Sequence, residues 1–245
     1  MKVSSKTAVI IGLGVFLAIG TATVTVREIE SHRAQAWRLG FDLSVLDRVP
    51  RQATIVPALS SRATNIHGWN GYHGMFLGLN QSVTNIVSVA YGVSSARVIF
   101  SGPIPAGKYD FISNTPKQQL EALRQEIKKE FNLVGRRESI TTNALMLILR
   151  NRNAGGWKRS ASASLSFNQS NGFISMSNYP AAALSRLAEN LLETPVVDRT
   201  GMTGYFDLRW DSTPDGLKNA IFDNLGVELV PGREPVEFLV VDKAN

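Results

Sequence analysis

The hydrophobic positions of the chain begin as one continuous run and continue further along as short strand and helix patterns. Residues 7–26 contain no charged side chain, and about 20 apolar residues are what a helix needs to cross the core of a bilayer. Lys2 and Lys6 precede the run, which favours a cytoplasmic N-terminus. We predict that residues 1–26 hold a single transmembrane helix in the bacterial inner membrane. The rest of the chain is then expected outside the cytoplasm, in the periplasm.

Cleavage of this segment as an export signal is the alternative. A signal peptide usually has a shorter apolar core and ends in a small-x-small cleavage site. Here the apolar run continues to Val26 and no Ala-x-Ala site follows, so an uncleaved anchor is favoured. Residues 27–74 are expected to form a polar stalk and an irregular connector with one strand at 53–56.

Residues 75–149 combine strand and helix periodicity and form the first predicted unit. Apolar residues at helical spacing follow the candidate caps Asn80 and Ser82, and again follow Pro116. Residues 150–172 are rich in Gly, Ser and Asn and are expected to be a polar linker or a long loop. The expected elements of the unit are strands at 75–79, 97–100, 109–113, 133–134 and 144–149, and helices ending at Tyr91 and near Phe131.

Residues 173–245 repeat this order and form the second predicted unit. One helix is expected to begin at Asn178 or Pro180, and another to be capped by Ser212 or Thr213 and to start at Pro214. Strands are expected at 173–176, 196–197, 205–210, 227–230 and 236–241, with a turn at 231–233 between the last two.

A conspicuous string, PVVDRTGMTGYFDL at residues 195–208, has a fainter counterpart earlier in the chain. Val98 precedes a loop that ends at Gly107, and Val196 precedes a loop that ends at Gly204. The two copies are 98 positions apart at the valines and 97 at the glycines. Such self-similarity indicates a duplicated unit. We therefore predict an α+β fold with two related β-α-β-β-α-β units, each with helices on one face of a small sheet.

The same string carries a family resemblance. Residues 195–208, 225–229 and 235–242 together resemble the Solibacter-type proteins, an uncharacterised family of soil bacteria with a domain of unknown function. The resemblance covers roughly residues 75–242 and implies no known reaction. More distantly, the order of elements is similar to the small periplasmic N-terminal domains of secretins and TonB-dependent receptors. That likeness implies protein interaction, although a shared fold alone does not fix function.

Composition excludes several classes of function. The chain has 245 residues and no cysteine, which excludes disulfides, thiolate metal sites and a cysteine nucleophile. Its net charge is +6, but the basic residues are scattered, so no nucleic-acid partner is expected. No phosphate-binding loop, Gly-x-Gly-x-x-Gly motif or Gly-x-Ser-x-Gly motif occurs. We therefore expect no catalytic residues and no cofactor.

Histidines provide the nearest approach to a metal site. His67, Trp69 and His73 lie close together in the sequence, but their spacing is not one that metal centres use. A polar surface loop is favoured, and no metal is predicted.

A polar loop near the second glycine turn is the other candidate site. We favour a structural turn over a binding loop, because Asp198 can form an Asx turn and Gly201 and Gly204 can supply positive φ. Arg199 is expected to pair with Asp198 or Asp207. The candidate binding residues are Asp198, Arg199, Thr200, Gly201, Thr203, Gly204 and Asp207.

The sequence thus predicts a non-catalytic protein-interaction module of the bacterial envelope, with another envelope protein as its partner. Exposed sheet edges in such units can pair with a strand of a partner. The alternative is a small-ligand-binding protein or an enzyme that uses loop 199–204. Asp110 and Asp207 hold equivalent places in the two units. That equivalence favours a shared structural role, such as a hydrogen bond across the hairpin, over two active sites.

Overall fold

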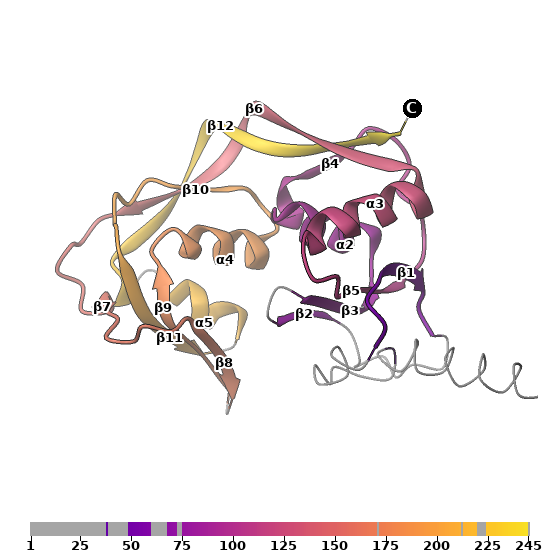
Figure 1. The fold of residues 1–245 in the computed structure, drawn as a ribbon. Helices are drawn as coiled ribbons and strands as arrows, with labels where there is room; N and C mark the ends of the chain where they lie inside the picture. The colour runs from indigo at the N-terminus through magenta and orange to yellow at the C-terminus, as the bar shows by residue number, and fades with distance from the viewer. Residues whose placement is uncertain are drawn as a thin grey trace, which may run out of the picture. The chain divides into compact units, whose positions relative to one another are not determined.

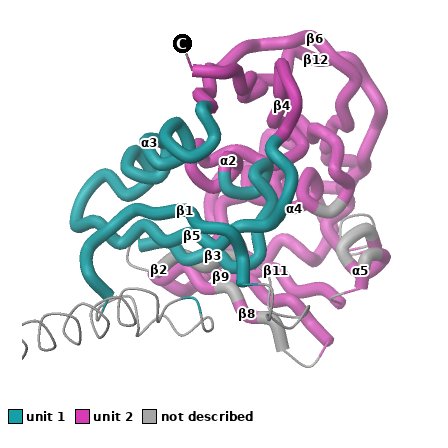
Figure 2. The backbone as a smooth tube through the Cα atoms, turned by 90° about the vertical axis from the view of Figure 1, so that its right-hand side faces the viewer, with its two compact units in different colours: residues 1–86, 105–132 teal, residues 87–104, 133–245 magenta. Residues whose placement is uncertain are grey.

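The computed structural model describes residue 38 and residues 49–59, 68–72, 75–170, 172–211, 213–219 and 224–244. They form a mixed α+β fold in which strands predominate, arranged as three four-stranded sheets (Figure 1). The chain divides into two compact units, one of residues 1–86 and 105–132 and the other of residues 87–104 and 133–245 (Figure 2). The predicted anchor at 7–26 lies outside the described residues. Among the residues described, no helix is long and apolar enough to span a bilayer.

The first compact unit is built on an antiparallel sheet with the strand order β1-β5-β3-β2. Alternation along the strands turns Leu77, Leu79 and Ile112 into the core, where all three are fully buried. Helix α3 (Gln119–Phe131) contacts β1 and β5 and buries Leu123 and Ile127, which lie one turn apart. The strands of this sheet are β1 (Ala53–Pro57), β2 (Gly68–Tyr72), β3 (Met75–Gln81) and β5 (Tyr109–Ser113).

Helix α2 (Val83–Tyr91) leads from the first unit into the second, since the boundary between the units falls after Ile86. The predicted cap is confirmed: Ser82 Oγ accepts a hydrogen bond from the backbone N–H of Asn85 at 3.3 Å. The short 3-10 helix η3 (Ser95–Arg97) follows and delivers the chain to the edge of the next sheet.

The central sheet of the second unit is made of two long strands and two short ones. β6 (Leu133–Leu149) and β12 (Val227–Lys243) pair antiparallel over their full length. β10 (Val196–Asp198) runs parallel to β6 on one side, and β4 (Val98–Phe100) runs parallel to β12 on the other, which gives the order β10-β6-β12-β4. Each short strand covers only three residues of its long neighbour.

The third sheet also belongs to the second unit and has the order β7-β11-β9-β8. Its inner face and the helix α4 (Ala183–Leu192) enclose a core in which Met176, Leu184 and Val196 are almost fully buried. The short helix α5 (Pro214–Asn219) packs on β11. The strands are β7 (Lys158–Arg159), β8 (Ser166–Ser170), β9 (Phe173–Pro180) and β11 (Tyr205–Asp211).

Two predicted breaks between strands are wrong. The strands expected at 133–134 and 144–149 are parts of one 17-residue strand, and so are those expected at 227–230 and 236–241 with the turn between them. The turn expected at 231–233 is absent: Pro231 and Pro235 lie opposite Leu145 and Thr141 at positions whose nitrogens face away from β6. A proline is tolerated in a strand where it has no ladder bond to donate, so β12 continues through both.

The expected single sheet per predicted unit is also wrong. Of residues 75–149, β3 and β5 lie in the sheet of the first compact unit, whereas β4 and β6 lie in the central sheet. Residues 173–245 are divided in the same way, with β9 and β11 in one sheet and β10 and β12 in the central sheet. The two compact units therefore have different boundaries from the units predicted at 75–149 and 173–245. That these two segments are duplicates of one another stays a prediction.

Two local expectations need correction as well. The predicted linker at 150–172 contains β7 and β8, which pair with β11 and β9. The helix expected at Asn178 or Pro180 begins instead at Ala183, because β9 continues to Pro180.

Candidate functional site

The polar loop after β10 is held by its own side chains. Asp198 Oδ1 accepts hydrogen bonds from the backbone N–H of Thr200 at 2.8 Å and from its hydroxyl at 2.7 Å. Thr200 Oγ1 in turn accepts from the backbone N–H of Met202, and Thr200 is only 5% exposed. Gly201 and Gly204 have φ values of 64° and 104°. The predicted Asx turn and both positive-φ glycines are therefore confirmed.

Arg199 does not pair as predicted. Its guanidinium lies 2.6 Å from Glu234 Oε2 on β12, and not beside Asp198 or Asp207. The backbone N–H of Arg199 also donates to Leu147 O, which ties the loop to β6. The polar groups of this loop thus mainly serve its own turn and its attachment to the central sheet. Its role as a binding loop stays a prediction.

Asp207 lies on β11 at an irregularity in the pairing with β9. Its Oδ1 accepts a hydrogen bond from the backbone N–H of Asn178, whose φ is 59°, at 3.0 Å. In the first compact unit, Asp110 Oδ1 accepts from the backbone N–H of Asn80, whose φ is 56°, at the same 3.0 Å. Each carboxylate secures a residue in the left-handed conformation at a bulge between neighbouring strands. This is the structural role that the sequence favoured.

Acid should weaken the contribution of Asp207 to stability. Hydrogen bonds from Ser160, from the Asn178 backbone and from Ser177 lower the pKa of the Asp207 carboxyl below its ordinary 3.8. Because the folded-state pKa is lower, the stabilisation is complete well above pH 3.8 and is lost as the pH falls through the folded-state value. We expect Asp207→Asn to destabilise the protein at pH 7, and the difference from wild type to shrink below pH 4. Urea unfolding at both pH values measures this; an equal difference at both would contradict it.

A cavity of about 520 Å³ lies against β9 and β11 in the second compact unit. Its volume is within the usual range of small-molecule pockets. Apolar Met176 and Trp210 line it together with charged Lys158 and Arg209. Of the predicted loop residues, only Asp207 is part of its lining. The structure therefore separates this cavity from residues 198–204, and sequence reasoning missed it because Lys158 fell in the predicted linker.

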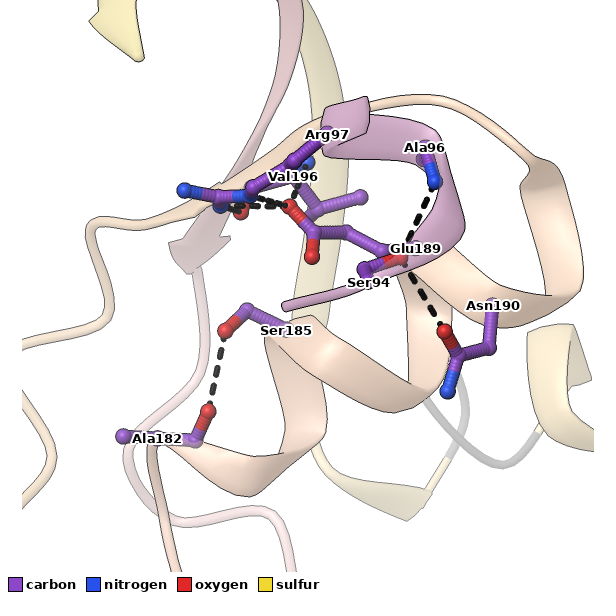
Figure 3. Close-up of polar contacts among 8 residues, drawn as sticks. All are labelled: Ser94, Ala96, Arg97, Ala182, Ser185, Glu189, Asn190 and Val196. Carbon is purple, nitrogen blue, oxygen red and sulfur yellow. Dashed lines mark hydrogen bonds and ion pairs between the residues drawn. The ribbon is translucent and has the colours of Figure 1, made fainter. Parts of the chain in front are cut away.

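A partly buried ion pair in the second unit was not predicted either (Figure 3). Glu189 on α4 is 3% exposed, and its Oε1 accepts from Arg97 Nε at 2.5 Å and from the backbone N–H of Val196 at 2.9 Å. Arg97 Nη2 also donates to Val196 O at 2.9 Å. Beside this pair, Ser94 Oγ donates to Asn190 Oδ1 at 3.1 Å. The cluster fastens η3 to α4 and to the start of β10.

The sequence held only a weak signal for this cluster. Glu189 is an acidic residue directly after Ala188, on a helix whose neighbouring positions Leu184 and Ala188 are almost fully buried. A charge at a core-facing position indicates a buried partner, but Arg97 is 92 positions away. Because its hydrogen bonds join η3, α4 and β10, the cluster has the features of a structural lock.

Metal binding finds no support in the part of the chain that is described. No group of three His, Asp or Glu side chains there is arranged to hold an ion. His67 and His73 lie outside the described residues, so the interpretation of that segment as a surface loop stays a prediction. Trp69 belongs to β2.

Comparison with known proteins yields a family. A family model described as a protein of unknown function (DUF3738) matches residues 84–244, which is more than half of the chain. No curated protein and no solved structure matches the chain.

Proposed function

The chain belongs to the DUF3738 family of proteins of unknown function, and from this premise we propose that it is a non-catalytic protein-interaction module of the bacterial envelope. In this proposal residues 7–26 anchor the chain in the inner membrane and the remainder lies in the periplasm. We also propose that the chain is related to the Solibacter-type proteins and, more distantly, resembles the interaction domains of secretins and TonB-dependent receptors.

Duplication of one ancestral unit is part of the proposal, and the register of the central sheet supports it. Val98 pairs with Leu239, and Val196 pairs with Leu145. These pairs correspond, since Val196 follows Val98 by 98 positions and Leu239 follows Leu145 by 94. β6 and β12 begin 94 positions apart as well, at Leu133 and Val227.

The bulges support duplication independently. The pairing of β3 with β5 shifts between Gly78 and Gln81, and the pairing of β9 with β11 shifts at Asp207. At both shifts an asparagine of positive φ donates to an aspartate of the neighbouring strand. A bulge is a specific backbone feature, so its recurrence with the same residue types favours common descent of the two segments.

The observation that carries the interaction proposal is the unpaired edge of the central sheet. β10 covers only residues 145–147 of β6, and β4 covers only residues 239–241 of β12. Among the described residues, no other strand pairs with the outer edges of these two 17-residue strands. Long unpaired edges are sites at which another chain can add a strand. The committed side chains of loop 198–204 and of the Arg97–Glu189 cluster fit a binding scaffold better than an enzyme.

Capture from envelope extract tests this function. The full-length chain carrying a C-terminal tag, in mild detergent, is expected to enrich a defined envelope protein over a tagged unrelated membrane protein. Alkaline phosphatase fused after residue 245 is expected to be active in cells, as periplasmic folding requires. Loss of fusion activity would overturn the proposed location, and absence of enrichment across growth conditions would overturn the interaction role.

A small-ligand-binding protein remains the second candidate, because the second unit has a cavity of about 520 Å³. Its lining combines apolar Trp210 with Lys158 and Arg209, which suits a small ligand with both apolar and polar parts. Loop 199–204, which the sequence put forward for this role, is not part of the lining. Isothermal titration with a metabolite panel, comparing wild type with Trp210→Ala, would test it.

A further inference from the structure

The two outer edges of the central sheet differ in their capacity to accept a strand. In an antiparallel pair, a residue directs both its N–H and its C=O either toward the partner strand or away from it. On β6 the N–H of Leu145 donates outward to Pro195 O, and Leu147 O accepts from the N–H of Arg199. The odd-numbered residues of β6 therefore point outward. On β12 Val241 O accepts from the N–H of Ser101, so its odd-numbered residues point outward too.

Prolines block the edge of β12. Its outward positions beyond β4 include Pro231 and Pro235, and neither residue has an N–H to offer an incoming strand. Prolines at such positions are a common protection of edge strands. The corresponding positions on β6, 94 residues earlier, are Arg137 and Thr141. The outer edge of β12 is thus blocked by prolines, and that of β6 has none at the matching positions.

The outer edge of β6 is covered at both ends and pairs with no described strand between them. At one end Tyr91 Oη accepts the outward N–H of Gly135 at 2.8 Å, and at the other β10 begins to pair at Leu145. The four outward residues between these ends are all exposed, and among the described residues no strand pairs with them. They are Arg137, Ser139, Thr141 and Asn143.

The two faces beside this edge differ in polarity. On the even-numbered side, Ile140 and Val197 pack against a small buried cluster of Ala144, Val236 and Phe238. On the odd-numbered side the exposed residues are polar, and on the even-numbered side Arg136 and Glu138, which precede Ile140, are exposed and charged. An open hollow of about 540 Å³, lined in part by Ala144 and Thr194, adjoins the end of the edge nearest β10. A strand beside β6 would therefore need apolar residues where it passes Ile140 and Ala144 on the even-numbered side, and polar residues on the other side.

We propose that the edge of β6 from Arg137 to Asn143 binds an extended segment of a partner protein by strand addition. The bound segment would pair with β6 next to the start of β10. Every second side chain of the segment would be apolar and would lie on the same side of the sheet as Val197, against Ile140 and the buried residues Ala144, Val236 and Phe238. This inference rests on the proposed interaction role and names the class of partner: a proline-free stretch with alternating apolar and polar residues.

A second copy of this chain matches the required pattern only at Ile140, which would lie opposite its own counterpart. Antiparallel pairing of two β6 edges centred on Ile140 would set Arg136 opposite Ala144 and Glu138 opposite Thr142. Charged side chains would then face the apolar cluster, where a partner needs apolar ones. The occupant is therefore a segment of a different protein.

Selection of displayed random heptapeptides on the immobilised full-length chain provides the probe. The peptides recovered are expected to alternate apolar and polar residues. Ser139→Pro and Thr141→Pro are expected to weaken their binding about tenfold or more, since each removes an outward N–H and obstructs the edge. Ser139→Ala and Thr141→Ala keep the N–H and are expected to bind within about twofold of wild type. Pro235 occupies the equivalent place in β12, so Thr141→Pro should fold, which circular dichroism checks.

A second measurement leaves the protein unchanged. N-methylation at successive positions of the best peptide should abolish binding at every second residue only, because alternate N–H groups face β6. Recovery of no peptide, equal binding to the proline variants, or N-methyl effects without alternation would each overturn the proposal. A concentration-dependent dimer abolished by Thr141→Pro would overturn it in favour of a second copy.

The same variants separate this inference from the proposed function. An envelope protein that wild type and Thr141→Pro capture equally would uphold the interaction role and overturn the β6 edge. Peptides that bind β6 with the alternating pattern, when no envelope protein is captured, would uphold the edge and overturn the envelope role.

Discussion

Removing the Glu189 carboxylate is expected to destabilise the protein by about 3 kcal/mol in the Glu189→Ala variant, the lower end of what breaking a fully buried pair costs, because the Arg97 side chain is 24% exposed. Glu189 is 3% exposed and accepts hydrogen bonds from both Arg97 and the backbone of Val196. Without it, the Arg97 guanidinium loses its counter-charge, and the N–H that begins β10 loses its acceptor. Desolvated groups that lose their partners are costly because water does not replace the lost interaction. Urea unfolding followed by circular dichroism measures the loss.

Two comparison variants separate charge from hydrogen bonding. Glu189→Gln keeps an acceptor for Val196 but removes the charge, and is expected to be less destabilising than Glu189→Ala. Glu237→Ala breaks the ion pair with Arg137, where both side chains are more than half exposed, and is expected to cost at most about 1 kcal/mol. Equal losses at positions 189 and 237 would show that the buried pair has no special role.

Gly78→Ala is expected to destabilise the first compact unit by about 1–3 kcal/mol. A Cβ at Gly78 would lie 2.0 Å from Cε1 of Phe111, its partner across β3 and β5, and the Phe111 ring is fully buried. Because the packed core leaves the ring no free volume, the strands must shift or the ring must leave its rotamer. Thermal unfolding should show a lower midpoint with native-like secondary structure.

A second glycine and a double variant test this explanation. Gly102→Ala should change stability by no more than about 0.5 kcal/mol, since no atom lies within 4 Å of its Cβ position. Phe111→Leu should offset part of the Gly78→Ala penalty, so that the two changes are less than additive. Strict additivity would mean that the ring is not what limits position 78. Across β9 and β11, Met176 pairs with Leu208, so that position combines two side chains of intermediate size.

Local chemistry made several elements of this chain predictable. The strand at Tyr109–Ser113, the Ser82 cap and the turns at Gly201 and Gly204 follow from short-range rules that depend on a few neighbouring residues. The structural use of Asp198 was predictable for the same reason, since its acceptor atoms bond to Thr200 only two positions away. The part of the candidate site that is formed locally was therefore accessible from the sequence.

Contacts between distant segments were not predictable in this way. Arg97 meets Glu189, and Arg199 meets Glu234 on another strand instead of a nearer aspartate. The continuity of β12 through Pro231 and Pro235 depends on which way their nitrogens face, and that is decided by the register with β6. The prolines alone predicted a turn. The sequence does not show that β12 forms its hydrogen bonds with β6 through the residues between these prolines, so that the missing N–H groups cost it nothing there.

The sequence by itself determined the alternation of strands and helices, the repeated string and the two aspartates at equivalent positions, because these are set by spacing and by residue type along the chain. Only the tertiary structure decided that the strands of residues 75–149, and likewise those of residues 173–245, are divided between sheets. It also decided that β6 and β12 pair over their whole length and that one of their edges is open. Which strands pair depends on the free energy of packing segments about 100 positions apart, and no property of either segment alone contains it.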